Sequence, residues 1–195
     1  MMDPMFRYFL GFQVSTDRAG WLARQLPNDS GDLFAGLKPQ LYHLTLCTIA
    51  ETQAQQPFLR QRVASAFASG LPAASPIPFG RIMSRRMGAE LTTIGSIADI
   101  RHLYDGIVAL LETQAIEPLH RKSGLRPHIT LGYGTCDFEA VSTAWRWTPR
   151  DLVLIESHIG HRRHRVLQSW TLEPPAQGSF GFMAEDLPAP MLRAA

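Results

Sequence analysis

Two short segments of the chain repeat one pattern, in which a histidine and a threonine lie two positions apart between apolar residues. The segments are HLTL, which begins at His43, and HITL, which begins at His128. Composition alone predicts about 0.1 such matches in a chain of this length, so a chance repeat would be rare. Successive side chains of a β-strand alternate between its two faces. The histidine and threonine of each segment are therefore expected to share one face, with the apolar residues on the other.

The chemistry that suits this set is acid–base catalysis on a phosphodiester. If the two strands meet across a cleft, His43 and His128 can serve as one neutral and one charged imidazole, because a histidine pKa near 6.5 allows both forms at neutral pH. One imidazole would take a proton from the attacking oxygen, and the other would give a proton to the leaving oxygen. The hydroxyls of Thr45 and Thr130 would donate to the non-bridging phosphate oxygens. Because the imidazoles supply both proton transfers, the sequence predicts a site without a metal or other cofactor.

These motifs resemble those of the 2H phosphoesterase superfamily, and in particular the 2′-5′ RNA ligase family, whose members act as RNA 2′,3′-cyclic phosphodiesterases. The resemblance covers about residues 6 to 173. It includes an aromatic first strand (FRYFLGF, from Phe6), the two His-Thr motifs, Ser157, and a Trp-x-Leu sequence that begins at Trp170. It implies an α+β fold with two pseudo-symmetric lobes, each an antiparallel sheet with outer helices. The active-site cleft would lie between the lobes.

The resemblance also implies a role for each motif residue. His43 would donate a proton to the leaving oxygen, His128 would activate water, and Thr45 and Thr130 would bind the phosphate. The implied enzyme is a hydrolase that opens 2′,3′-cyclic phosphates on RNA ends or nucleotides to a 2′-phosphate, and whose reverse reaction would be 2′-5′ RNA ligation. The alternative is an inactive nucleotide- or RNA-binding module on the same fold.

The sequence departs from the family pattern at two places. Thr48, Ile49 and Ala50 follow the first motif, where the family has an aromatic residue, an aliphatic residue and a glycine. Tyr133 stands five residues after the second histidine, where a basic residue is common. A tyrosine could stack on a base or simply cover the end of the strand. These differences leave open whether the substrate is a tRNA fragment, an oligonucleotide or a mononucleotide.

Several other residues could bear on a site, and each also has a structural interpretation. Strict alternation would place Cys47 on the face of His43, where we interpret it as a small packing residue. The segment SHIGHRRHRV, residues 157 to 166, could suggest a metal site through His158, His161 and His164, but it lacks a carboxylate or cysteine ligand set. Its arginines could form a basic rim for RNA, although a solvated turn is the better interpretation: Arg162, Arg163 and Arg165. Arg126 and Lys38 are weaker candidates for that rim, and His102 and His120 are interpreted as surface residues.

Composition limits the class of protein. The 195 residues carry a net charge of only +2, which does not indicate a nucleic-acid coat or a membrane-binding surface. Arginine greatly outnumbers lysine, which suits phosphate binding but equally suits a biased genome. The two cysteines, Cys47 and Cys136, have no metal-ligand spacing and are expected to be free thiols in a reducing compartment. No apolar run is long enough to span a membrane. We expect a cytoplasmic monomer.

Hydrophobic periodicity and turn residues predict the elements that carry these motifs. Besides the two His-Thr strands, strands are predicted over residues 6–14, 77–85, 90–94, 151–158 and 166–172. Helices are predicted over residues 17–26, 57–68, 97–115 and 138–145, with a loop over residues 28–40. Residues 1–175 would form one bilobal domain, and residues 176–195, rich in Pro, Gly and Ala, a flexible tail.

Overall fold

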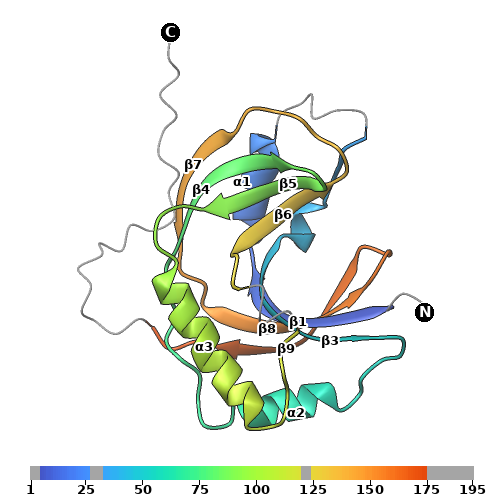
Figure 1. Ribbon diagram of the computed structural model, residues 1–195, viewed down its shortest axis with the longest axis vertical. Coiled ribbons are helices and arrows are strands. Elements are labelled where there is room, and N and C mark those ends of the chain that lie inside the picture. Colours follow the sequence, from blue (N-terminus) through green and yellow to red (C-terminus); the bar gives the residue numbers. More distant parts are fainter. Residues whose placement is uncertain (1–4, 27–32, 120–123, 175–195) are drawn as a thin grey trace.

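The computed structural model describes residues 5–26, 33–119 and 124–174. These described residues form nine strands, three α-helices and one turn of 3₁₀ helix (Figure 1). In chain order the elements are β1 (Phe6–Gln13), α1 (Thr16–Gln25), β2 (Ala35–Gly36), η1 (Pro39–Leu41), β3 (His43–Thr52), α2 (Leu59–Ala66), β4 (Ile77–Arg85), β5 (Gly88–Thr93), α3 (Ala98–Glu112), β6 (His128–Tyr133), β7 (Val141–Trp147), β8 (Asp151–His158) and β9 (Arg163–Thr171). No helix among these residues is long and apolar enough to cross a membrane.

The strands form two antiparallel halves that meet at the two His-Thr strands. The first lobe has the order β3-β1-β8-β9, and the second lobe has the order β6-β5-β4-β7, with β2 added beside β6. The halves join where β3 pairs with β6 through Leu44 and Ile129. Figure 1 shows the two curved sheets facing each other on either side of this junction. The fold is therefore α+β with an antiparallel sheet in each lobe, as the sequence predicts.

The helices cover the outer faces of the lobes. Helix α1 packs against the second lobe, where Arg18 lies over the rings of Trp21 in α1 and Trp145 in β7. Helices α2 and α3 lie against the first lobe (Figure 1). There Phe67, at the end of α2, packs edge-to-face on Trp170 of β9. The inward faces of both sheets are thereby left for the site.

The alternation predicted for the His-Thr strands is present, with one interruption in β3. Leu44 and Leu46 are buried in the core, whereas the residues between and before them are half-buried. A β-bulge after Thr45 then shifts the register between β1 and β3. Gly11 lies at this shift, and a Cβ there would collide with the carbonyl oxygen of Leu44, so only glycine allows the close approach. The bulge turns Cys47 toward Leu10 and into the core, so its predicted place on the face of His43 is wrong.

Three predicted segments differ from the structure. The helix predicted over residues 138–145 is wrong, because this segment contributes to a strand, β7 (Val141–Trp147), that pairs with β4. The segment is rich in β-branched and aromatic residues, which favour strands. Its buried residues Thr143 and Trp145 lie two positions apart on one face, which is the spacing of a strand rather than of a helix. Strand β9 begins at Arg163, earlier than predicted, and β2 and η1 lie within the predicted loop. The predicted tail and His120 lie outside the described residues.

Candidate active site

The two His-Thr pairs lie on one face of the molecule, on neighbouring antiparallel strands. Leu44 of β3 is paired directly with Ile129 of β6, and both side chains are fully buried. Residues that flank a paired position point to the opposite face. His43 and Thr45 therefore share a face with the pair on β6, His128 and Thr130, and all four side chains are half-buried. The structure brings the predicted residues together at the junction of the two lobes.

Both histidines are held in the same way. Nδ1 of His43 lies 2.7 Å from the carbonyl oxygen of Leu41, and Nδ1 of His128 lies 2.8 Å from the carbonyl oxygen of Arg126. A carbonyl oxygen only accepts, so each Nδ1 must carry the hydrogen and donate it. In the neutral ring, Nε2 is then the atom that is free to take up a proton. The same contact to residue i−2 in both lobes fixes the tautomer that acid–base catalysis requires.

The surroundings of His43 are aromatic. Its ring stacks on Phe9 at 4.8 Å between centroids and meets the ring of His164 edge-on at 4.9 Å. Phe9 itself is buried in a small apolar cluster with Val153 and Ile155. The pKa of His43 is lowered to about 4, chiefly by this burial and to a smaller extent by the neighbouring imidazoles of His164 and His128, against the hydrogen bond to Leu41, which raises it. Without a bound anion, His43 is neutral at neutral pH.

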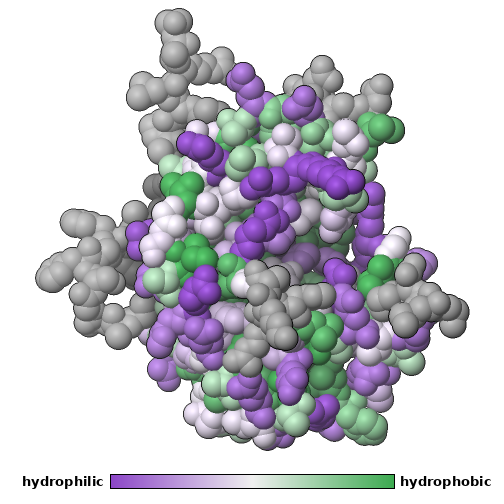
Figure 2. Space-filling model, in the orientation of Figure 1, coloured by the Kyte–Doolittle hydropathy of each residue, from purple (hydrophilic) through white to green (hydrophobic). Residues whose placement is uncertain are grey.

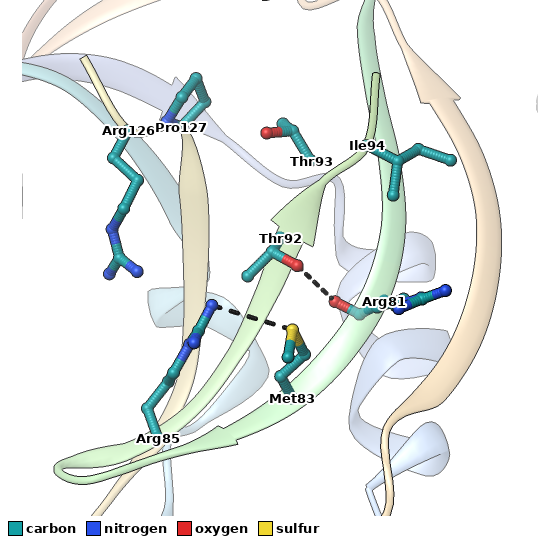
Figure 3. Close-up of a pocket in the computed structure, with 8 residues that line it drawn as sticks. All are labelled: Arg81, Met83, Arg85, Thr92, Thr93, Ile94, Arg126 and Pro127. Atoms are coloured by element: carbon teal, nitrogen blue, oxygen red, sulfur yellow. Dashed lines mark hydrogen bonds between the residues drawn. The ribbon is translucent and has the colours of Figure 1, made fainter. Parts of the chain in front are cut away.

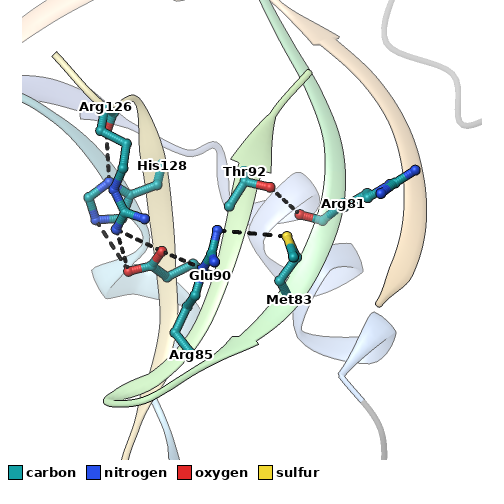
Figure 4. A network of polar contacts seen from close by, with 7 residues as sticks. All are labelled: Arg81, Met83, Arg85, Glu90, Thr92, Arg126 and His128. Carbon is teal, nitrogen blue, oxygen red and sulfur yellow. Dashed lines mark hydrogen bonds and ion pairs between the residues drawn. The ribbon is translucent and has the colours of Figure 1, made fainter. Parts of the chain in front are cut away.

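The surroundings of His128 are charged (Figure 4). Oε1 of Glu90 in β5 lies 3.8 Å from Nε2 of His128. The same carboxylate accepts two hydrogen bonds from Nη2 of Arg126, at 3.0 and 2.9 Å, and its Oε2 lies 3.6 Å from Nε of Arg85. The two motifs are thus identical in sequence pattern and backbone contact, and different in the charges around them.

A pocket of about 310 Å³ opens beside His128, over β4, β5 and the start of β6 (Figure 3). Arg85, Arg126 and Thr92 line it, with Met83 and Pro127 among its apolar walls. Figure 2 shows hydrophilic side chains gathered over this part of the second lobe, above a hollow between the lobes. The pocket lies next to the predicted catalytic residues.

The histidines and arginines of residues 157–166 lie in different places and make different contacts. His158 stacks on Phe6 at 5.0 Å and meets the tilted ring of His161 at 4.0 Å, whereas His164 faces His43. Among the described residues, no group of three or more His, Cys, Asp or Glu side chains is arranged to hold a metal ion. Arg165 extends to Glu156, at 3.0 Å.

The predicted solvated turn is present only in part: all three arginines are exposed, and Arg162 lies in the turn with a positive φ, but Arg163 and Arg165 belong to β9. Arg126, a weaker candidate for a basic rim, is the one bound to Glu90. Lys38 and His102 are exposed.

Sequence reasoning missed three neighbours of the histidines: Phe9, Glu90 and His164. Phe9 belongs to the aromatic strand noted in the sequence, but its contact with His43 depends on the register between β1 and β3. Glu90 lies on the same face as Thr130 because the two residues are paired between β5 and β6. His164 could have been found had β9 been predicted to begin at Arg163, because alternation would then have placed it on a strand face.

The two-lobed antiparallel fold, with paired His-Thr strands at the junction, is the 2H phosphoesterase fold. Solved structures with this fold cover nearly the whole chain. TT0787 from Thermus thermophilus superposes with a TM-score of 0.68 at 16% identity, over 87% of this chain and 99% of that one. A phosphoesterase gives 0.64 at 16% identity, over 88% and 99%. E. coli LigT complexed with 3′-AMP gives 0.64 at 16% identity, over 87% and 99%. No family model and no curated protein matches the sequence. At these identities the likeness shows the fold.

Proposed function

We propose that this protein is a phosphodiesterase that opens 2′,3′-cyclic phosphates on RNA ends or nucleotides and leaves a 2′-phosphate. One observation carries the proposal. His43 and His128 lie on adjacent strands, and each donates Nδ1–H to the carbonyl oxygen of residue i−2, which leaves both Nε2 atoms for proton transfer. Two imidazoles held alike at one junction suit a reaction that needs one base and one acid.

The proposed reaction has one concerted exchange at phosphorus. Nε2 of His128 takes a proton from water as the water oxygen forms a bond to phosphorus. The bond between phosphorus and O3′ breaks, and His43 gives its proton to O3′. Thr45 and Thr130 donate hydrogen bonds to the non-bridging oxygens, where negative charge grows. With the 5′-hydroxyl of a second strand in place of water, the same ring opening forms a 2′-5′ linkage.

His43 must gain a proton before it can act as the acid. Its pKa of about 4 means that protonation at neutral pH costs about 4 kcal/mol in the ligand-free protein. A phosphate anion about 4 Å away contributes about 4 kcal/mol at an effective dielectric constant near 20. The substrate's own charge therefore offsets this cost and raises the pKa of His43 toward neutral pH. In this mechanism the protein takes up a proton together with its anionic substrate.

The solved neighbours agree with this use of the fold. E. coli LigT has been solved with phosphate and with 3′-AMP. A ligand of that kind, bound between the two histidines here, would meet the Thr hydroxyls on the same face. The low pKa of His43 is also the observation that favours the second candidate, a non-catalytic nucleotide-binding module, since a permanently neutral His43 could bind but could not donate.

Product analysis distinguishes the two candidates. The protein is incubated in excess chelator with 2′,3′-cyclic mononucleotides and with an RNA that ends in a cyclic phosphate, and the products are identified as 2′- or 3′-phosphates. The proposed enzyme gives 2′-phosphates and keeps its rate in chelator, because the imidazoles carry both protons. Binding of the nucleotides with turnover no faster than the uncatalysed reaction would instead establish the binding module.

A further inference from the structure

The pocket beside His128 is continuous with the catalytic face, because strand register places its residues there. Thr92 of β5 is paired with His128, and Glu90 is paired with Thr130. On the next strand, Arg81 is paired with Thr92 and Met83 with Glu90. Directly paired residues point to the same face of a sheet. The polar face therefore runs from the histidines across β5 to β4.

The pocket combines positive charge with an apolar wall. Figure 3 shows Arg126, just before β6, and Arg85, at the end of β4, along one side of the pocket, with Thr92 and Met83 across from them. The side chains of Arg85 and Arg126 are 42% and 61% exposed, so both can bind a ligand from solvent. Nη2 of Arg85 lies 3.8 Å from the sulfur of Met83. A guanidinium plane beside an apolar surface is suited to stacking on a nucleobase as well as to binding phosphate.

The charges of the pocket leave an excess for an anion. Glu90 is the carboxylate that Arg85 and Arg126 share, and it is 16% exposed. One carboxylate balances one guanidinium, so this trio alone keeps one positive charge. The pocket also lies close to the reacting phosphate. Arg81 and His128 are two strands apart, about 10 Å at about 4.8 Å per strand. A single RNA strand spans that distance within a few nucleotides.

We propose that this pocket, which we call the arginine pocket (Arg85, Arg126, Thr92, Met83 and Pro127), holds the nucleotide on the 5′ side of the cyclic phosphate. Its phosphodiester meets the guanidinium of Arg85, and its base packs on the Met83 and Pro127 wall. The preferred substrate is then an oligoribonucleotide with a cyclic-phosphate end, and a cyclic mononucleotide is a poor one. This inference rests on the proposed function, since it names the substrate class of the same site.

The experiment compares two substrates in three proteins. The substrates are a 2′,3′-cyclic mononucleotide and a short oligoribonucleotide with the same cyclic end. The proteins are the wild type, Arg85→Gln and Arg86→Gln. Arg86 is a matched control, because it is the next residue, is also exposed in the β4–β5 turn, and does not line the pocket. Arg85 is preferred to Arg126 as the test, because the Arg126 carbonyl also holds His128.

We expect the wild type to prefer the oligonucleotide by at least about 10-fold in kcat/KM, as one charge-assisted phosphate contact and one stacked base suggest. Arg85→Gln should reduce that preference by roughly 5- to 10-fold, and Arg86→Gln should leave it unchanged. The KM for the oligonucleotide should also depend less on salt in Arg85→Gln. A plot of log KM against log salt concentration should lose about 0.7 of its slope, the value for one lost phosphate contact to a single strand.

Other outcomes overturn the inference or the proposed function separately. A wild type without preference, or equal losses in Arg85→Gln and Arg86→Gln, would overturn the arginine pocket while leaving the phosphodiesterase intact. Absence of turnover on both substrates would overturn the proposed function. Binding of a 2′-phosphate-ended oligonucleotide, compared with a 2′-phosphate mononucleotide in the same three proteins, then decides the pocket by itself, with the same expected ratios.

Discussion

His43 and His128 begin from the same sequence pattern and the same backbone contact, and they end in opposite environments. His43 is packed between Phe9 and His164. His128 faces Glu90, which Arg126 and Arg85 in turn bind. One half of the site is aromatic, and the other half is charged.

The motif therefore sets the tautomer of each histidine, and residues outside the motif set its surroundings. The i−2 carbonyl contact is local, because it joins residues two apart in the chain. Most of the surrounding residues are not local: Phe9 and Glu90 come from the strands that pair with β3 and β6, and His164 comes from β9. Two imidazoles with the same motif thereby lie in unequal surroundings, and the role of acid proposed for His43 depends on the proton that it gains with the anionic substrate.

The largest expected effect tests whether the two halves do take unequal parts. His43→Ala and His128→Ala should each reduce kcat by roughly 100- to 10,000-fold, since each removes one proton transfer. A substrate with sulfur in place of O3′ has a leaving group that needs no proton. It should restore most of the rate to His43→Ala and little to His128→Ala, measured by single-turnover kinetics.

Rescue of His128→Ala alone would reverse the two roles, and equal behaviour of both variants would remove the asymmetry. The double variant should lose far less than the product of the single losses, because the residues act as a unit. Wild-type rates in either single variant would contradict the acid–base assignment outright.

The second prediction concerns stability against pH. The pKa of His43 falls from 6.5 in the unfolded chain to about 4 in the fold, so the unfolded chain binds a proton in this window that the native protein does not. The stability contributed by His43 is present above pH 6.5 and is lost as the pH falls to about 4. The loss is about 3 kcal/mol.

Urea unfolding at several pH values measures this slope. His43→Gln should make the free energy of unfolding depend less on pH between about 4 and 6.5. Thr45→Val removes no titrating group and should leave this pH dependence unchanged. A slope unchanged by His43→Gln would show that the aromatic shell does not exclude the charge from His43.

The same distinction between local and non-local contacts explains what could be predicted from the sequence. The four motif residues and their shared face follow from alternation within a strand, and the structure places His43, Thr45, His128 and Thr130 accordingly. Alternation gave the wrong face for Cys47 because a bulge after Thr45 adds a residue to β3. A bulge depends on the partner strand as well as on the strand itself.

The missed residues share one cause. Phe9, Glu90 and His164 come to the histidines through pairing of strands that are distant in the sequence. Which residues contact the histidines depends on the register between strands, and a single sequence specifies that register only weakly. Segment 138–145 was mistaken for a helix because its short apolar pattern fits both periods, and its place beside β4 selects the strand.

The third prediction compares the threonines of the two halves. Thr45→Ala and Thr130→Ala should each reduce kcat by roughly 10- to 100-fold, because one neutral hydroxyl donor contributes about 1 to 3 kcal/mol. Thr→Ser at each position keeps the hydroxyl and should restore most of the rate. Steady-state kinetics on a cyclic phosphate measures both. A large loss at one threonine with none at the other would mean that the phosphate is held by one lobe only.

The smallest expected effect separates the two reasons for the low pKa of His43. Burial is the larger cause, and the neighbouring imidazole of His164 is a smaller one. His164→Phe keeps an aromatic ring against His43 and removes only the imidazole, whereas His164→Ala also admits water. Both should raise the pKa of His43, and His164→Ala should raise it more, as measured by NMR titration of the His43 ring. The effect on kcat should stay below about 10-fold in both variants, because neither touches a proton in transfer. An equal rise in the two variants would assign the low pKa to charge rather than to burial, and the aromatic half of the site would then be no drier than the charged half.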